Sequence, residues 1–265
     1  MSRKPVLKME ALTVSIGNQP ILADVELSIA AGECVALLGE SGSGKSMTAR
    51  AALGLLPPQA RLAGRVEVNG RDVSGASALS RDGAARPAMV MQDTLSALNP
   101  LTSIGYQLEW PLRRSGLGRA EARAEARRLL ADVGLPDPEQ IAARSSPELS
   151  GGQRQRVCIA IALACAAPVI IADEPTSALD VVTQAQILQL LKSVTVAPGG
   201  PGLLFITHDL HAAAHLCDRA LVIEAGRVVE AGPMRRILTD PQHPHTRRLI
   251  ASAASCGIAC ERLHA

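Results

Sequence analysis

The chain has 265 residues, of which 47% are hydrophobic, so it is long and apolar enough for one large α/β domain or a domain with an inserted subdomain. Its formal net charge of +2 argues against a dedicated nucleic-acid surface, and no nucleic-acid partner is expected. The six cysteines are scattered, several in strongly apolar segments, which is typical of buried free thiols in a reducing cytosol. Cys256 and Cys260 form a C-x3-C pair, but no further cysteine or histidine stands at metal-ligand spacing, so a metal site there is disfavoured.

No signal peptide or membrane span is expected. Residues 1–14 contain charged side chains and no continuous apolar stretch. Residues 157–172 are uncharged and mostly apolar, but they are fewer than the roughly 20 that a spanning helix needs, and Pro168 interrupts them. We predict a buried helix that ends near Ala166, then a buried strand. Any membrane association would come through a partner.

The first third of the chain predicts strands around one helix. Residues 6–29 alternate short apolar runs about Gly17-Asn18, which is typical of antiparallel strands. Residues 33–38 predict a compact strand, and residues 45–56 a helix that Pro57-Pro58 would stop. Shorter strands are expected at residues 65–68, before the tight turn Asn69-Gly70, and at residues 88–91.

The chain changes character between about residues 93 and 150. Residues 121–130 are rich in Ala, Arg, Glu and Leu, which favour helix, so we expect a helical subdomain inserted into an α/β core. Strands return at residues 169–172, 203–207 and 220–224 with helices between them, which predicts a mainly parallel sheet. After Gly232 the tail is expected to be irregular. The expected division is an α/β core with its β subdomain at 1–91 and 156–235, a helical insertion at 92–155 and a C-terminal extension at 236–265.

A glycine-rich segment between the second predicted strand region and the helix fits the P-loop pattern: Gly39-Glu40-Ser41-Gly42-Ser43-Gly44-Lys45-Ser46. Backbone N–H groups of such a turn point at phosphate oxygens, and the helix N-terminus adds positive potential. Lys45 would neutralise β/γ-phosphate charge, and the Ser46 hydroxyl would bind Mg²⁺. An ordinary Gly-Ser loop is the alternative, and it does not explain why Lys45 and Ser46 are both in register.

Two acidic residues follow the predicted strand at residues 169–172. Asp173 would emerge at the carboxyl end of that strand, where ligand sites of open α/β sheets gather. It would hold Mg²⁺, through water, and Glu174 would act as a general base on the water that attacks the γ-phosphate. Two acids after a strand are often only a solvated strand end, so this interpretation depends on their spacing behind the P-loop.

A second motif, Leu149-Ser150-Gly151-Gly152-Gln153, opens the helical stretch that runs through Arg156. Ser150 and the amides of Gly151 and Gly152 would present another anion-binding helix N-terminus. A plain N-cap at Ser150 is the alternative. Both can hold at once, but the cap alone does not account for Gly-Gly-Gln.

Together, the P-loop and residues 149–153 resemble ATP-binding-cassette (ABC) ATPases, and the resemblance covers nearly the whole chain. It implies an α/β fold with a P-loop NTPase (RecA-like) core, an antiparallel β subdomain and an inserted helical subdomain that carries the signature. It also implies ATP and Mg²⁺ as cofactors. In this family, the signature of one subunit, here Ser150, Gly151, Gly152 and Gln153, closes over nucleotide on the P-loop of another.

Further marks of the family occur in order. Gln92 resembles the Q-loop glutamine, which couples nucleotide to the membrane partner and is assigned to both the catalytic set and the Mg²⁺ ligands. Asp180, in Ser177-Ala178-Leu179-Asp180, resembles the D-loop contact to nucleotide. His208 resembles the switch histidine at the γ-phosphate. His211 and His215 have metal-ligand spacing, but no third ligand is evident, so we interpret them as a helix surface.

One position departs from the family. Where an aromatic residue usually stacks on adenine, Val14-Ser15-Ile16-Gly17 supplies Ile16, and the aromatic residues of the chain lie elsewhere. Stacking of a base on an aromatic ring is worth roughly 1–3 kcal/mol. We therefore expect adenine to rest on Ile16 with weak specificity, while phosphate binding is unaffected.

Residues 91–100 and 241–249, the latter with an HP-x-T-R-x-L pattern, resemble dipeptide, oligopeptide and nickel importers, and residues 46–57 resemble the first of their two ATPase subunits. The shortness of the chain is similar to the nickel-import ATPase "D" subunit, so nickel import is the preferred function and dipeptide or oligopeptide import the alternative. The resemblance implies a second ABC ATPase subunit (a homodimer or a heterodimer), two membrane permeases and an extracytoplasmic solute-binding protein. The chain would be peripheral on the cytoplasmic face of the inner membrane.

Two other classes are weighed against an importer subunit. Soluble ABC ATPases of DNA repair or translation resemble two cassettes in one chain or a cassette split by a long coiled coil, and neither occurs here. Nucleotide kinases and GTPase switches share the P-loop, but they do not explain residues 149–153. The sequence does not identify the transported solute, because an ATPase subunit does not touch it.

Overall fold

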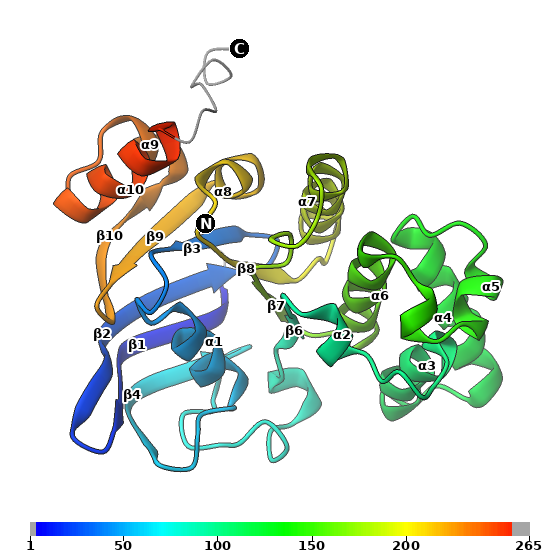
Figure 1. The fold of residues 1–265 in the computed structure, drawn as a ribbon. Helices are drawn as coiled ribbons and strands as arrows, with labels where there is room; N and C mark the ends of the chain where they lie inside the picture. Colours follow the sequence, from blue (N-terminus) through cyan, green and yellow to red (C-terminus); the bar gives the residue numbers. More distant parts are fainter. Residues whose placement is uncertain (1–3, 256–265) are drawn as a thin grey trace.

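The computed structural model describes residues 4–255, which form two sheets with helices packed around them (Figure 1). The smaller sheet is antiparallel, with the order β2-β1-β4-β5. Asn69 and Gly70 join its last two strands, both with φ in the left-handed region, as a tight hairpin turn requires. Its strands are β1 (Pro5–Ile16), β2 (Gln19–Ala30), β4 (Ala60–Val68) and β5 (Arg71–Asp72).

The larger sheet has the order β10-β9-β3-β8-β7-β6 and is parallel except for the β9–β10 hairpin. This confirms the mainly parallel sheet predicted from the strand and helix alternation. Because parallel strands end at the same edge, the segments after β3, β7 and β8 come together there. The strands are β3 (Cys34–Leu38), β6 (Ala88–Val90), β7 (Val169–Asp173), β8 (Gly202–Thr207), β9 (Arg219–Glu224) and β10 (Arg227–Pro233).

The inner strands β3, β7 and β8 of the larger sheet are buried on both faces. In β8, Leu203 and Phe205 pack into the core shared with the helices, whereas Leu204 and Ile206 pack into a second core shared with the antiparallel sheet and α1 (Lys45–Leu53). Because both faces of these strands are buried, their sequences are apolar at consecutive positions.

Helices between β6 and β7 form a separate lobe beside the sheets (Figure 1). Within this lobe, α6 packs against α2, α3 and α4. The same helix joins the lobe to the core, because it also contacts β6 and α7. The helices are α2 (Thr94–Ala97), α3 (Ile104–Arg114), α4 (Arg119–Asp132), α5 (Pro138–Ala143) and α6 (Gly151–Ala164), with a 3-10 turn at Ser146–Glu148; another 3-10 turn, Gly83–Ala85, precedes β6. The remaining helices are α7 (Val181–Val196), α8 (Leu210–Leu216), α9 (Met234–Thr239) and α10 (Pro244–Ser255).

Two expectations about the elements are corrected. The first helix ends at Leu53 rather than Leu56, because Gly54 adopts a left-handed C-cap with φ of 71° before the prolines are reached. The tail after Gly232 is mostly helical rather than irregular: α9 and α10 lie beside β9 and β10 (Figure 1). By contrast, α6 ends at Ala164 and β7 begins at Val169, close to the predicted change from helix to strand. No helix among residues 4–255 has the length and apolar character needed to cross a bilayer.

The described cysteines are free, and three of them are buried: Cys34, Cys158 and Cys217. Burial raises the pKa of Cys34 to about 11, so this thiol is an inert core group. Cys165, in contrast to the expectation of buried thiols, is exposed. Cys256 and Cys260 lie outside the described residues.

Candidate functional site

The predicted P-loop joins β3 to α1 at the carboxyl edge of the larger sheet. Gly42 and Gly44 have φ of 80° and 112°, a region that residues with a Cβ rarely adopt, so the turn depends on glycine at both positions. Gly44 is the N-cap of α1 and supplies no side-chain cap. The first N–H groups of α1 are therefore left for an anion.

Lys45 is folded back into its own loop. Its side chain is buried, and Nζ donates to the carbonyls of Gly39 (2.7 Å) and Glu40 (2.8 Å). Burial lowers the pKa of Lys45, and the nearby charges of Glu174 and Asp173 oppose that shift. The ammonium group is thus held by backbone oxygens of the kind that phosphate oxygens can replace.

Asp173 ends β7 beside the start of α1. Burial raises the pKa of Asp173, and the charge of Glu174 raises it further, whereas Lys45 and a hydrogen bond from Ser46 act in the opposite direction. A partly buried carboxylate, a hydroxyl and a second carboxylate form a set of hard oxygen donors with excess negative charge. This is the chemistry that Mg²⁺ prefers.

Glu174 and His208 come together across the neighbouring strand ends. The Glu174 amide donates to the Ile206 carbonyl (2.9 Å), which holds this residue at the unusual φ of 49°. Its Oε1 lies 2.7 Å from Nδ1 of His208. The Glu174 side chain is 15% exposed and that of His208 is 65% exposed, so the histidine reaches inward from solvent to the carboxylate.

Ser150 begins α6 with a complete capping box. Its hydroxyl accepts from the Gln153 amide (3.3 Å), and the Gln153 side chain accepts from the Ser150 amide (3.0 Å). A Cβ on Gly152 would lie 2.7 Å from Cγ2 of Thr183, whereas one on Gly151 would meet only Leu179 at 3.7 Å. Capping thus accounts for Gln153 and packing against Thr183 accounts for Gly152, whereas neither requires glycine at position 151.

Asp180 precedes α7, the helix whose Thr183 lies against Gly152. It caps α7, and its carboxylate accepts from the Thr183 amide (3.0 Å) and the Thr183 hydroxyl (2.7 Å). These bonds lower the pKa of Asp180. Asp180 therefore has a structural role as the cap of α7.

Gln92 follows a strand at the same sheet edge as the cluster formed by Lys45, Ser46, Asp173, Glu174 and His208, whereas Ile16 lies in the smaller sheet. Gln92 is exposed and follows β6, which pairs with β7 through Val90 and Ala172, so it belongs to the same sheet edge. Ile16 is half-buried at the end of β1, opposite Gln19 and Ala60 in the smaller sheet. His211 and His215 are exposed on α8, which confirms their interpretation as helix surface.

The turn between β9 and β10 also contacts the P-loop, which the sequence did not indicate. The Gly226 amide donates to the Ser43 carbonyl (2.8 Å), and the Gly226 carbonyl accepts from Ala23 of β2 (2.9 Å). A Cβ on Gly39 would collide with the Ile223 carbonyl at the end of β9. The only available signal was the dipeptide Ala225-Gly226 between apolar strands, which predicts a turn but not what the turn touches.

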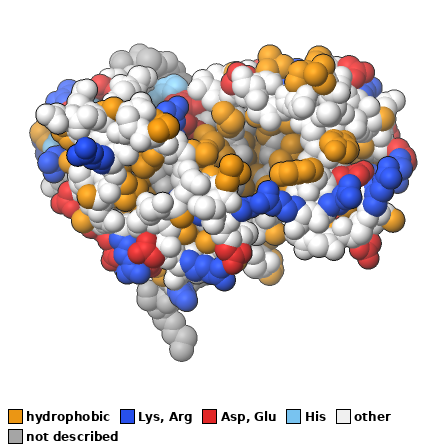
Figure 2. Space-filling view, turned by 90° about the horizontal axis from the view of Figure 1, so that it is seen from below, with side chains coloured by type: hydrophobic (Ala, Val, Ile, Leu, Met, Phe, Trp, Pro, Cys, Tyr) orange, Lys and Arg blue, Asp and Glu red, His pale blue; other side chains and the backbone are white. Residues whose placement is uncertain are grey.

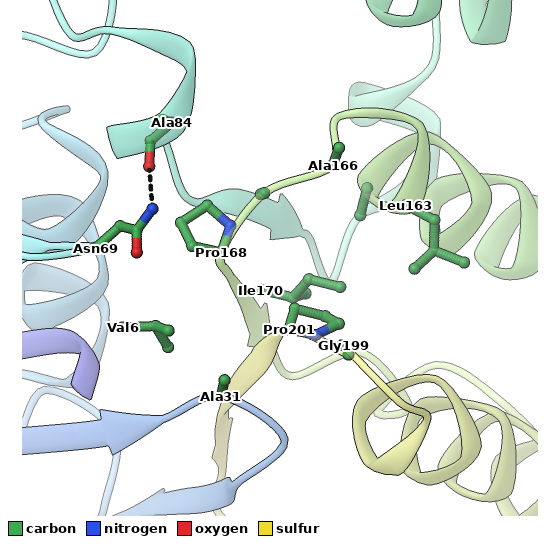
Figure 3. A pocket seen from close by; sticks show the side chains of 13 residues that line it. Val6, Ala31, Asn69, Ala84, Leu163, Ala166, Pro168, Ile170, Gly199 and Pro201 are labelled. Atoms are coloured by element: carbon green, nitrogen blue, oxygen red, sulfur yellow. Dashed lines mark hydrogen bonds between the residues drawn. The ribbon is translucent and has the colours of Figure 1, made fainter. Parts of the chain in front are cut away.

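A cavity of about 420 Å³ lies at the opposite edge of the larger sheet (Figure 3). Pro168 and Pro201, which precede β7 and β8, form part of its wall together with Val6 and Leu163. Among the lining residues, Asn69 has the only polar side chain, and its amide donates to the Ala84 carbonyl (3.4 Å). Because its lining has no charged group, this cavity does not suit a nucleotide.

Comparison with known proteins places the chain in a family. The sequence profile of the "ABC transporter" family matches residues 22–177. The chain is 41% identical over 271 residues to "Probable D,D-dipeptide transport ATP-binding protein DdpD" of Escherichia coli (strain K12), covering 99% of this chain and 82% of that protein. It is also 41% identical to "Glutathione import ATP-binding protein GsiA" of Shigella flexneri serotype 5b, covering 95% of this chain and 42% of that protein.

A solved structure shows the same fold. It is the dimeric, post-hydrolysis state of the ATP-binding cassette MJ0796 bound to ADP and Pi, with a TM-score of 0.73 and 30% identity over 86% of this chain and 99% of that one. The α/β core, antiparallel sheet and P-loop of our structure agree with this cassette fold. The chain therefore belongs to the ABC transporter family, as one of its ATP-hydrolysing ATP-binding subunits.

Proposed function

We propose that the chain is the ATP-hydrolysing subunit of an ABC importer for peptides or small peptide derivatives. The observation that carries this proposal is the 41% identity, over nearly the whole chain, to ATP-binding proteins named for D,D-dipeptide transport and glutathione import. The preference for nickel drawn from the length of the chain has no such support. The peptide alternative is favoured instead.

The residues of the site divide into distinct roles. The P-loop amides and Lys45 bind the phosphates. Ser46 and Asp173 hold Mg²⁺, which when bound neutralises phosphate charge, and Gln92 lies on the same edge. Glu174 takes a proton from the attacking water, and His208, 2.7 Å away, orients Glu174 and reaches the γ-phosphate from the exposed side.

The signature serves the site of another subunit. In this chain α6 packs against α2, α3, α4, α7 and β6, whereas α1 packs against β2, β4 and β7, so the two anion-binding helix starts belong to different parts of the molecule. We propose that Ser150, Gly151 and Gly152 contact nucleotide on the P-loop of a second ATPase subunit, which is either a copy of this chain or a related one. Asp180 and Ile16 complete the contacts, the latter under adenine.

A hollow between the core and the helical lobe supports a permease partner. Figure 2 shows this hollow with hydrophobic side chains on its walls. A cavity of about 640 Å³ lies between the lobes, lined by Arg81, Arg86 and Pro87 on one side and by Trp110 and Arg114 of α3 on the other. Trp110 is 60% exposed, and the Arg114 guanidinium lies 5.6 Å from its ring centroid. We propose that one of the two permeases binds here and holds the chain on the cytoplasmic face of the inner membrane.

Reconstitution tests the assignment. The chain is placed in vesicles with candidate permeases and a solute-binding protein from the same organism, and uptake of a labelled dipeptide is compared with uptake of ⁶³Ni²⁺. ATP-dependent dipeptide uptake that is lost in Glu174→Gln supports the proposal. Uptake of nickel but not of peptide would overturn the peptide assignment, and hydrolysis that never responds to permeases would overturn the importer assignment.

A further inference from the structure

The C-terminal segment with the HP-x-T-R-x-L pattern converges on one carboxylate at the end of β9. Oε1 of Glu224 lies 3.0 Å from Nδ1 of His245 and accepts from Nη2 of Arg248 (2.9 Å). Arg248 also lies 3.3 Å from His245, so the three groups form one cluster. His245 is 2% exposed although it is polar, which shows how closely α10 is seated on the sheet.

A second contact fixes the start of the same segment to β10. The Glu230 carboxylate accepts from the amides of Gln242 (2.9 Å) and His243 (3.0 Å). Glu224 and Glu230 lie on the two strands of the β9–β10 hairpin, so the C-terminal segment holds both strands of that hairpin.

The turn of this hairpin supports the P-loop. Gly226 is two residues beyond Glu224, and its amide donates to the Ser43 carbonyl (2.8 Å). A Cβ on Gly44 would lie 3.3 Å from the Gly226 Cα, and the Ile223 carbonyl lies against Gly39. The hairpin therefore touches the P-loop at three places: strand β9 at Gly39, and the turn at Ser43 and at Gly44, the N-cap of α1.

We propose that Arg248 and His245 are positioning residues for nucleotide binding. They hold Glu224, Glu224 holds the β9–β10 turn, and the turn sets the P-loop backbone whose amides receive the phosphates. The inference rests on the proposed binding of nucleotide at this loop. Because β2 also holds the turn, through the bond from Ala23 to Gly226, losing the cluster weakens nucleotide binding without abolishing it.

The chain offers a matched control on the same helix. Arg247 is exposed, like Arg248, but its guanidinium donates to the carbonyls of Pro241 (3.0 Å) and Gln242 (3.2 Å), which belong to the C-terminal segment itself. Arg247→Ala thus removes the same charge and side-chain length without touching Glu224. Since both arginines are exposed, neither replacement leaves a cavity in the core.

The test measures the equilibrium affinity of the full chain for Mg·AMP-PNP, with the thermal midpoint of the nucleotide-free chain alongside. We expect Arg248→Ala to weaken affinity on the order of two- to five-fold, the scale of one partly exposed ion pair, and Glu224→Gln to weaken it at least as much. Arg248→Lys should restore most of the loss, and Arg247→Ala should match the unaltered chain. In the assembled complex, KM for ATP should rise while kcat at saturation stays unchanged, because Glu174 and His208 are not displaced.

The inference would be overturned if Arg248→Ala and Glu224→Gln bound the nucleotide as tightly as the unaltered chain. It would also be overturned if Arg247→Ala lost as much affinity as those two variants. A fall in kcat with unchanged KM would also contradict it. Lys45→Ala separates this result from the proposed function. If the unaltered chain and Lys45→Ala bind the nucleotide equally, the P-loop assignment fails and the inference fails with it.

Discussion

Nδ1 of His208 lies 2.7 Å from Oε1 of Glu174, across the carboxyl ends of the adjacent strands β8 and β7. An ionised carboxylate only accepts hydrogen bonds, so Nδ1 is the donor in this pair. The pair therefore links the residue proposed to activate water to the residue proposed to touch the γ-phosphate.

Replacement of Glu174 by Gln tests this link directly. The amide oxygen of Gln can still accept from His208, so the local geometry and ATP binding should persist, but the base is lost. Turnover in the assembled complex should fall on the order of 10²- to 10⁴-fold, and the variant should accumulate as a nucleotide-bound dimer. Size-exclusion chromatography with ATP and single-turnover hydrolysis measure both effects. Turnover close to that of the unaltered complex would remove Glu174 from the mechanism.

Asp173→Asn should separate stability from function. Burial, and next the charge of Glu174, raise the pKa of Asp173, so folding favours its protonated form. The stability contributed by this carboxyl is fully present below its unfolded pKa of about 3.9 and is lost as pH rises through the folded value. The Asn variant should thus be more stable than the unaltered chain near neutral pH, with the difference shrinking toward about pH 4.

Urea unfolding of the nucleotide-free chain, without Mg²⁺, measures this difference at several pH values. Mg²⁺-dependent ATP binding should weaken in the same variant, because Asn offers no charge to the cation. Equal stabilities across the whole range would show that Asp173 carries no electrostatic penalty.

The placement of these residues at one edge of the sheet could be predicted from the sequence, and the reason is topological. Lys45, Asp173 and His208 each follow a buried parallel strand, and such strands end at one edge. Contacts between side chains could not be predicted from the sequence. The pairing of Glu174 with His208 depends on the φ of 49° at Glu174, which no residue pattern predicts. Gly152 likewise depends on how closely α7 approaches α6.

The tail was mispredicted for a local reason. Two prolines in this tail, Pro241 and Pro244, favour irregular chain by sequence, but α10 begins at Pro244. The first helical position tolerates proline, because its missing N–H would have no partner within the helix. The prolines therefore mark the start of a helix here. That helix contacts Glu224 through Arg248, and the segment before it contacts Glu230 through Gln242, at carboxylates that precede it in the sequence.

Gly152→Ala tests the packing role found at the signature. A Cβ there would lie 2.7 Å from Cγ2 of Thr183, so the variant should lose about 1–3 kcal/mol of unfolding free energy. Thr183→Ser removes that methyl group and keeps the hydroxyl that bonds Asp180, so the double variant should recover most of the loss. Gly151→Ala is the control, since its Cβ would meet Leu179 at an ordinary 3.7 Å. A Gly151→Ala variant as unstable as Gly152→Ala would contradict this account.

Ile16 predicts weak discrimination between nucleotides. If adenine rests on an aliphatic side chain, ATP and GTP should compete within a few-fold of each other. Ile16→Tyr should tighten ATP binding by up to roughly 1–3 kcal/mol, the scale of base stacking. Ile16 is only half-buried at the end of β1, so the larger ring can be accommodated. Competition titrations with a fluorescent nucleotide decide the matter, and a strong ATP preference in the unaltered chain would mean that another residue recognises the base.

A nucleotide site shared by two subunits leads to the last prediction. One substitution in the signature should affect the nucleotide site of its own chain and that of the partner differently. Ser150 caps α6, away from the elements that surround the P-loop of its own chain. Ser150→Arg should therefore leave nucleotide binding at its own Lys45 intact while abolishing hydrolysis at the partner's P-loop, where the bulky cation blocks closure. Mixed complexes that carry Ser150→Arg in one subunit and Lys45→Ala in the other, in both combinations, distinguish the two sites. The isolated chain should hydrolyse ATP weakly and gain activity with its partner and permeases. Full activity that is independent of protein concentration and partners would reject a site built from two subunits.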